Sequence, residues 1–329
     1  TIRLHPYRSS HHLLVRGGTV YVMNSVSVRQ TLSILCAAAT ISGCDMTKFA
    51  ANSTVGVMKQ AAGAFTSEHD PWLARRAATG NLKFAEGILR ATPENEDLLI
   101  LLAKNYNNYA FAFLMEDLDN LNWGTDEFTE VSNRAVDFFT RSRQYAVQRL
   151  ALDFEDAGTA VFAPGDRLEQ ILGEAEPEKH LSALYWLPSS WGNIISLQSD
   201  DPDILADLPR VKRIMQWVRK HDGNYANGGA HLFFGVINTA LPKQLGGDPE
   251  AAKQGFLDGI AVSDGRYLMG KALYGYYYFR AVDDREGYVK TLQDVLDTPG
   301  DIMPEQRLAN ELAKIRAQRW LGEVDEYFE

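Results

Sequence analysis

The stretch that decides the fold is Thr92–Phe113, TPENEDLLILLAKNYNNYAFAF. Beyond its polar start, the large apolar side chains recur at steps of three, four and seven, which is typical of a helix that buries one face. These residues are Leu98, Leu101, Leu102, Tyr106, Tyr109 and Phe113. No convincing run of alternating β-branched residues bounded by turn residues occurs in the sequence, so we predict an all-α fold.

Outward from this stretch, one three-residue pattern recurs along the sequence. It consists of a residue that is usually polar, then proline, then often an acidic residue. The polar side chain can cap a helix, proline needs no hydrogen-bond acceptor in the first turn, and the acid faces the positive end of the helix dipole. The pattern predicts six helix starts. They are Asp70-Pro71, Thr92-Pro93, Glu176-Pro177, Asp201-Pro202, Asp248-Pro249 and Met303-Pro304.

The apolar period between these starts predicts about ten to twelve helices. The approximate spans are 71–91, 93–117, 126–152, 166–173, 177–187, 202–221, 229–240, 249–262, 266–281, 284–297 and 304–326.

A weak internal similarity favours stacked helical hairpins. Gly80-x3-Phe84-x2-Gly87 and Ala252-x3-Phe256-x2-Gly259 fit the second helix of a tetratricopeptide repeat, in which small residues allow close approach and the aromatic fills the gap. The repeat period is not sustained, and residues 118–248 depart from it. We therefore expect degenerate tetratricopeptide-like hairpins rather than a regular solenoid.

The N-terminal region differs from the rest in charge. Residues 1–43 contain four arginines and no acid, and they include an apolar stretch at 32–41 that is too short to span a bilayer, which takes about 20 residues. This stretch is typical of a signal peptide. Its ending, Ile41-Ser42-Gly43-Cys44, resembles the bacterial lipobox, in which the cysteine is acylated. The alternative is a buried apolar segment that happens to contain a cysteine.

These features predict a domain organisation. Residues 1–22 are an extension upstream of the signal peptide, 23–43 the lipoprotein signal peptide, 44–66 the lipidated Cys44 with a tether, and 67–329 a single helical domain. Because Cys36 lies in the signal peptide, Cys44 is the one cysteine of the mature chain, which leaves no internal disulfide.

Composition excludes several classes of protein. With 329 residues, 45% of them hydrophobic, the chain has ample material for a globular core, so disordered and fibrous classes are excluded. The formal net charge of -10, with no basic cluster, argues against binding of nucleic acid.

No enzyme signature is convincing. The segment Gly265–Lys271 has the spacing of a phosphate-binding loop but lacks the final Ser or Thr and a preceding strand. The histidines expected in the mature chain form no i,i+4 pair, and Ser189 and Ser190 lack the glycine of a nucleophile elbow. We therefore predict no catalytic residue, no metal, no cofactor and no enzymatic activity.

Three segments are candidates for binding: Tyr185–Asn193, which has three large aromatics around a proline break; Tyr225–Gly235, with a glycine-rich entry; and a helical stripe with Lys271. The stripe consists of Tyr267, Lys271, Tyr274 and Tyr278. One interpretation is that these aromatics fill a helical core. The other is an amphipathic cavity wall, because buried phenols and a buried ammonium need partners.

Several motifs together resemble a known family. They are Trp186–Gly192, Asp201-Pro202, Leu208-Pro209, Asn224-Tyr225, Gly228-Gly229-Ala230-His231 and Pro242-x3-Leu245-Gly246-Gly247-Asp248-Pro249 followed by Ala251, Ala252 and Phe256. Over about residues 72–300, the sequence resembles the T-component of tripartite ATP-independent periplasmic (TRAP) transporters. It departs from the family in its long helices between 118 and 173.

The resemblance implies a lipid-anchored periplasmic all-α protein, pierced by a ligand-sized pore, that associates with the solute-binding P-component and forms homo-oligomers. We expect it to bind or pass a small amphipathic solute, with a carboxylate, without covalent chemistry. The expected pore-wall residues are Trp186, Trp191, Asn193, Tyr225, His231, Lys271 and Tyr274. The alternative is a membrane-tethered scaffold that binds a protein or peptide partner on a concave helical surface and has no small-molecule site.

Overall fold

The computed structural model describes the backbone of residues 28–163, 165–241 and 246–328, and the side chains of these ranges from residue 46 onward, apart from residue 47. Cys44 therefore lies outside the described side chains. The chain divides into two compact units, residues 1–47 and 48–329. Of the first unit, the described backbone is helical.

Every regular element in the described ranges is a helix, which confirms the all-α prediction. The N-terminal half contains α1 (Val28–Thr66), α2 (Pro71–Ala91), α3 (Glu96–Tyr109), the π-helix η1 (Ala110–Leu114), α4 (Met115–Asp119), α5 (Asp126–Ala151), α6 (Ala157–Ala160), α7 (Arg167–Glu174) and α8 (Pro177–Leu197). The C-terminal half contains α9 (Pro202–Leu205), α10 (Leu208–His221), α11 (Tyr225–Ala240), α12 (Pro249–Ala261), α13 (Leu268–Leu273), the π-helix η3 (Tyr274–Tyr278), α14 (Phe279–Ala281), α15 (Arg285–Asp297), two 3-10 turns, α16 (Arg307–Gly322) and α17 (Val324–Tyr327).

Most of the predicted proline starts are correct. At α2, the side chain of Asp70 accepts hydrogen bonds from the backbone N–H groups of Trp72 and Leu73, and Asp201 and Asp248 cap α9 and α12 in the same way. The start predicted at Thr92-Pro93 is wrong. α3 begins at Glu96, because the side chain of Asn95 accepts from the N–H of Leu98 and takes the cap position.

The predicted helix 177–187 is too short, because α8 continues through Pro188 to Leu197. Proline removes one hydrogen bond of the helix. The hydroxyl of Ser190 donates to the carbonyl oxygens of Trp186 (2.7 Å) and Leu187 (3.2 Å) in this turn. Pro188 is buried, and α8 packs against α3, α5 and α10, so tertiary packing outweighs the local cost.

The glycine-rich entry of α11 is a left-handed turn. Ala226, Asn227 and Gly228 have φ of 52°, 56° and 77°, so right-handed helix begins at Gly229, as the sequence predicted. Non-glycine residues adopt this conformation at a cost of roughly 1–2 kcal/mol each. The turn brings the backbone of Gly228 against Gly259 of α12: a Cβ at 228 would lie 2.9 Å from the Cα of Gly259.

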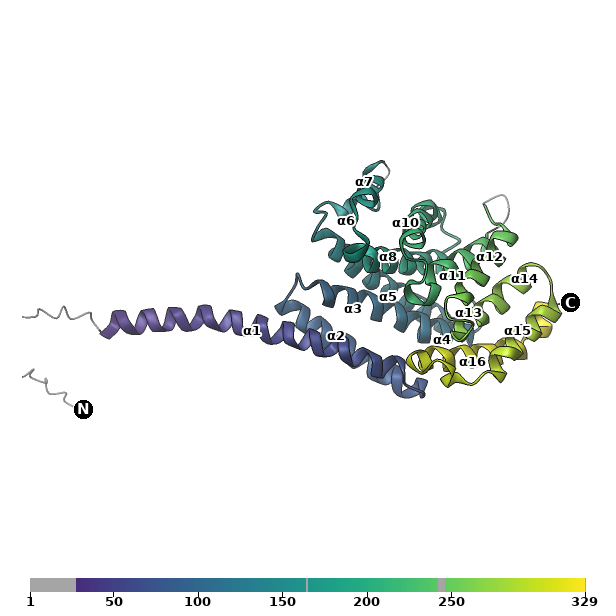
Figure 1. The fold of residues 1–329 in the computed structure, drawn as a ribbon, viewed down its shortest axis with the longest axis horizontal. Helices are drawn as coiled ribbons and strands as arrows, with labels where there is room; N and C mark the ends of the chain where they lie inside the picture. The colour runs from purple at the N-terminus through teal and green to yellow at the C-terminus, as the bar shows by residue number, and fades with distance from the viewer. Residues whose placement is uncertain (1–27, 164, 242–245, 329) are drawn as a thin grey trace, which may run out of the picture. The chain divides into compact units, whose positions relative to one another are not determined.

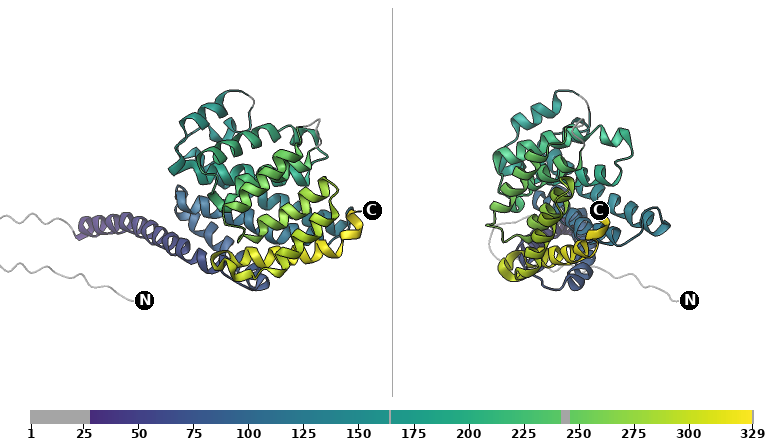
Figure 2. Two further views of the ribbon diagram at one scale, coloured as in Figure 1. Left: turned by 45° about the vertical axis from the view of Figure 1, so that its right-hand side comes forward. Right: turned by 90° about the vertical axis from the view of Figure 1, so that its right-hand side faces the viewer.

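Within residues 48–329 the helices stack in sequence order (Figures 1 and 2). α2 packs on α3, α3 on α5, α5 on α8 and α8 on α10, and α11 then packs on α12. The C-terminal helix α16 packs on α13 and α15 and also contacts α2. Residues from the two ends of this unit therefore meet next to α3.

The aromatics of the two repeat motifs pack differently in the structure. Phe256 is completely buried against Gly235 of α11, and Gly259 lies against Leu232, as expected for an aromatic that fills the gap between close helices. Phe84, the matching aromatic of the first motif, is 57% exposed. The first motif therefore does not fill a helix–helix gap.

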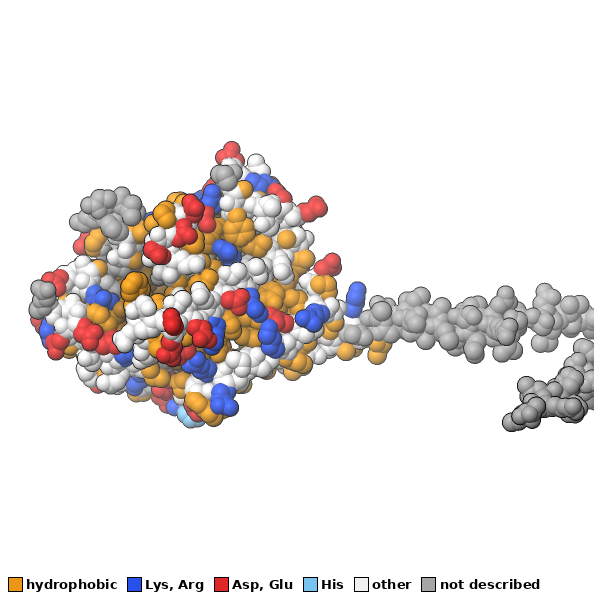
Figure 3. Space-filling view, turned by 180° about the vertical axis from the view of Figure 1, so that it is seen from behind, with side chains coloured by type: hydrophobic (Ala, Val, Ile, Leu, Met, Phe, Trp, Pro, Cys, Tyr) orange, Lys and Arg blue, Asp and Glu red, His pale blue; other side chains and the backbone are white. Residues whose placement is uncertain are grey.

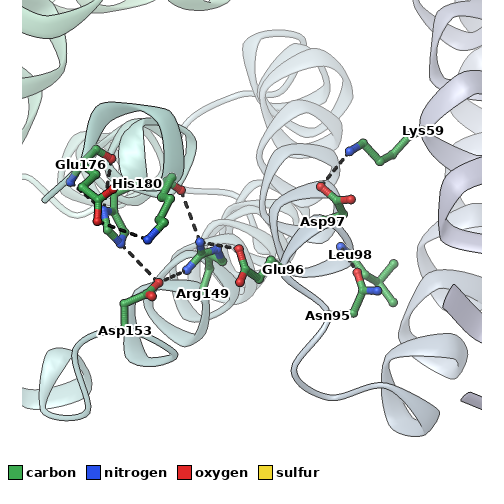
Figure 4. A network of polar contacts seen from close by, with 10 residues as sticks. Lys59, Asn95, Glu96, Asp97, Leu98, Arg149, Asp153, Glu176 and His180 are labelled. Atoms are coloured by element: carbon green, nitrogen blue, oxygen red, sulfur yellow. Dashed lines mark hydrogen bonds and ion pairs between the residues drawn. The ribbon is translucent and has the colours of Figure 1, made fainter.

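A buried arginine fixes α3 against α5 and α8 (Figure 4). Arg149 of α5 is 2% exposed, and its guanidinium donates to Glu96 at the start of α3 (2.6 Å) and to Asp153 (2.5 Å). His180 of α8 contacts the same Asp153 carboxylate through Nε2 at 3.2 Å, while its Nδ1 accepts from the N–H of Glu176. The network sets the position of α3 relative to two neighbours.

Residues 48–66, expected as a tether, are helical and take part in the fold. Val55 is buried in the core, Lys59 forms an ion pair with Asp97 of α3 (2.7 Å), and Asn52 accepts a hydrogen bond from Asn95. The last turns of α1 are therefore part of the unit that contains α2 and α3.

Candidate functional site

A cavity of about 300 Å³ lies where α1, α2, α3, η1 and α16 meet. Its volume is at the lower end of the range for small-molecule sites, roughly 300–1,000 Å³. Its walls are mainly apolar. The lining residues are Met58, Ala61, Ala62, Phe65, Thr66, Ala78, Asn81, Leu82, Phe84, Leu101, Lys104, Asn105, Asn108, Tyr109, Phe111, Ala112, Phe113, Tyr267, Met269, Gln306, Leu308, Ala309 and Leu312.

Helical periodicity places the lining residues of α3 and those of α1 on one face of their helix. On α3, Leu101, Lys104, Asn105 and Asn108 fall at i, i+3, i+4 and i+7, so they share one face. On α1, residues 58, 61, 62 and 65 follow the same spacing. The cavity is therefore built from helix faces whose order is fixed by the stack.

The polar part of the lining is concentrated on α3. Lys104 forms no hydrogen bond or ion pair with any residue that the structure describes, and burial lowers the pKa of its ammonium below the ordinary value. Around the same cavity, the side chains of Asn81, Asn105 and Asn108 also form no hydrogen bond within the described ranges. Among the described residues, the lining contains no carboxylate.

The far wall is formed by Tyr267 and by the π-helix η1. Burial raises the pKa of Tyr267 to about 12, with a smaller opposing effect from Arg316. Arg316, itself buried, donates to the carbonyl oxygen of Phe111 in η1 and contacts Glu116 (3.3 Å). π-Helical turns often occur at functional sites, and here the arginine holds one against α16.

Trp186 and Tyr225, two of the residues predicted from the sequence, lie outside the cavity, and both pack against the ring of Tyr185. The ring of Tyr185 lies 4.8 Å from that of Trp186 and 5.1 Å from that of Tyr225, and the Tyr225 hydroxyl donates to Ser182 (2.9 Å). Burial raises the pKa of both tyrosines. The buried indole N–H of Trp186 has no acceptor among the described residues. This group is a buried aromatic cluster with an unsatisfied donor.

Trp191 and Asn193, on the same helix α8, have other neighbours. Trp191 is 1% exposed, and its ring lies 4.9 Å from Phe162 and 5.4 Å from the guanidinium of Arg143. The amide of Asn193 donates to the carbonyl oxygen of Ser189 (2.9 Å).

The remaining three predicted residues lie on α11, α13 and η3. The Nδ1 of His231 lies 3.8 Å from the carboxylate of Asp258 and forms no hydrogen bond with the described part of the chain. Burial lowers the pKa of His231 against the opposing effect of Asp258. Lys271 forms an ion pair with Asp294 (2.7 Å). Tyr274 packs among Phe256, Tyr278 and Phe279.

The structure therefore does not bring all seven predicted residues together, and none of them lines the 300 Å³ cavity. The polar residues that do line it, Lys104 and its asparagine neighbours, were not singled out from the sequence. A signal for them exists: one lysine and several asparagines interrupt a helix that is otherwise largely buried, in LLAKNYNNY.

A second hollow, of about 480 Å³, lies on the surface between α9, α10 and the end of α11. Its lining includes Lys212 and Arg213, and Arg213 is already paired with Glu169 at 2.6 Å. On the face drawn in Figure 3, acidic and basic side chains are interspersed with hydrophobic ones.

The described residues contain no cluster of three or more His, Cys, Asp or Glu side chains arranged to hold a metal ion. No helix in the described ranges combines the length and the hydropathy that crossing a bilayer requires.

Comparison with known proteins gives one family. No protein of curated function matches the chain. The family described as TRAP transporter T-component matches residues 67–328, which covers most of the chain and all helices from α2 to α17. The resemblance seen in the sequence is thereby confirmed, and the chain belongs to the TRAP transporter T-component family.

Proposed function

We propose that this accessory transport protein is a lipid-anchored periplasmic protein that binds or passes a small amphipathic solute to or from the solute-binding P-component. Family membership supports the transport role. The observation that carries the solute-binding part is the cavity beside α3, with largely apolar walls and a small polar face. Apolar walls with a few placed polar groups are the usual composition of a small-molecule site.

The anchor is proposed from the sequence alone. Cys44 follows a lipobox-like segment, and a diacyl group with an N-acyl chain would provide the several apolar chains that stable attachment requires. In the bacterial host, labelled palmitate should enter the wild-type chain and not Cys44→Ser. Equal labelling of both would contradict the anchor.

The seven residues predicted from the sequence remain a proposal for a passage beyond the cavity. Trp186 supports it, since its buried indole N–H forms no hydrogen bond within the described ranges. His231 gives weaker support, since its buried Nδ1 also forms no hydrogen bond there but has the Asp258 carboxylate at 3.8 Å. A bound molecule or water that reaches these atoms would remove the cost of their burial.

The function is tested by mixing the purified chain with the P-component from the same host and measuring transfer of a labelled solute between them. A cavity-blocking variant, Ala309→Phe on α16, should abolish transfer while leaving association intact. Association without any solute binding, unchanged by Ala309→Phe, would support the scaffold alternative instead. Absence of both association and transfer would contradict the proposed function.

A further inference from the structure

Lys104, like Arg143, is a partly buried cation that forms no hydrogen bond or ion pair with the described residues. Arg143 lies over the rings of Phe162 and Trp191, whereas Lys104 faces a cavity. It lies on a helix face that lines a cavity, and no residue that the structure describes offers it a carboxylate or an acceptor. Other cations that are more buried are paired: Arg149 with Glu96 and Asp153, and Arg316 with Glu116. An ammonium that is partly removed from water without a partner costs free energy. The fold therefore keeps one charge in a place where a purely structural role would favour a neutral side chain.

Two side chains next to Lys104 are also half-buried and without a hydrogen bond in the described ranges: Asn105 and Asn108, which share its helix face. Asn81 of α2 also lines the cavity and forms no side-chain hydrogen bond with the described residues, but it is solvent-exposed. A carboxylate has about four lone-pair sites, and an ammonium and an amide NH₂ supply three and two donors. One ammonium and these amides are enough to satisfy one carboxylate.

The charge of the cavity limits what else can enter. Lys104 is the single charged residue among the described residues of the lining, and the remaining walls are mostly Ala, Leu, Met and Phe. A second carboxylate would lie against apolar side chains without a cation, which is costly. A neutral ligand would leave the ammonium unpaired. An anion with one charge and an apolar body is the complementary ligand.

We propose that Lys104, with the amides of Asn81, Asn105 and Asn108, binds the carboxylate of an amphipathic monocarboxylate whose apolar body lies between α1, η1 and α16. This inference rests on the proposed solute-binding function and deepens it. It names the charged residue of the site, which is Lys104 and not the ion-paired Lys271, and it excludes dicarboxylates of the same length.

The test is calorimetric titration of the full chain with octanoate, octanamide and octanedioate. Octanoate should bind at least about tenfold more tightly than the other two, a difference of about 1.4 kcal/mol. Lys104→Gln should reduce octanoate affinity to that of octanamide without changing octanamide binding. Lys104→Arg should retain the preference for the carboxylate. Lys290→Gln, on the exposed face of α15, is the matched control and should bind like the wild type.

The outcomes separate this inference from the function on which it rests. Octanoate binding that Ala309→Phe abolishes but Lys104→Gln leaves unchanged would overturn the role of Lys104 and keep the solute cavity. Equal binding of octanoate and octanedioate would overturn the monocarboxylate class. Binding unaffected by either variant, or no binding of any of the three, would overturn the site itself. Thermal melting of each variant shows that loss of binding is not loss of folding.

Discussion

The hydroxyl of Tyr185 lies in the space that a side chain at Gly229 would occupy: a Cβ at this position would be 2.0 Å from the hydroxyl oxygen. Glycine is therefore required for steric reasons at Gly229, the second glycine of the Gly-Gly-x-His segment. It allows the first turn of right-handed helix in α11 to approach α8 closely. The aromatic group of Tyr185, Trp186 and Tyr225 depends on this approach.

Gly229→Ala should destabilise the protein by about 1–3 kcal/mol, because the added methyl group must displace Tyr185 from a buried position. Urea unfolding measures the change. Gly87→Ala is the matched control, since a Cβ at Gly87 meets nothing within 4 Å and the glycine lies on an exposed part of α2. That change should be neutral or stabilising by up to about 1 kcal/mol. Equal effects of the two substitutions would contradict this account of the motif.

Acid should weaken the junction of α3, α5 and α8. Hydrogen bonding from Arg149, with His180 assisting, holds the pKa of Asp153 below its ordinary value. A carboxyl group with a lowered pKa in the folded state stabilises the fold above its unfolded pKa, roughly 3.9, and this stabilisation is lost as the pH falls through the folded value.

Asp153→Asn should therefore lower the melting temperature at pH 7. As the pH falls below about 4, the melting temperature of this variant should decrease less than that of the wild type. Melting curves between pH 7 and pH 2.5 measure this. Parallel pH profiles of the two proteins would show that Asp153 does not contribute in this way.

Lys104→Met should stabilise the ligand-free protein by about 0.5–2 kcal/mol, because it replaces a partly buried, unpaired ammonium with an apolar side chain of similar length. The same variant should lose binding of octanoate. The exposed Lys290→Met should change stability by less than about 0.5 kcal/mol. A destabilised Lys104→Met would indicate that the lysine has a structural role that the contacts do not show.

The fold could be read from the sequence more completely than the site. Helical periodicity and the Asp-Pro caps at Asp70 and Asp248 are local signals, so α2 and α12 were predicted with nearly the observed bounds. The continuation of α8 through Pro188 was missed because burial on several sides decides it, and burial depends on helices distant in sequence.

Which lysine belongs to the candidate site could not be predicted from the sequence, because it depends on how distant helices pack together. Lys271 and Lys104 are both lysines among apolar helical neighbours, and the sequence alone favoured Lys271 because three tyrosines share its stripe. The structure gives Lys271 a partner in Asp294 from α15 and leaves Lys104 facing a cavity. The partner of one lysine and the cavity beside the other are both set by the packing order of the helices, which no local pattern encodes.

The central claim is that the space between α1, α3 and α16 holds a small molecule in the cell. A crystal structure of the chain purified from its native host without added ligand tests this claim most directly. The account predicts elongated electron density in this cavity, with its anionic end within hydrogen-bond distance of Lys104 Nζ. A cavity that contains only water, or that is closed by its own side chains, would contradict it.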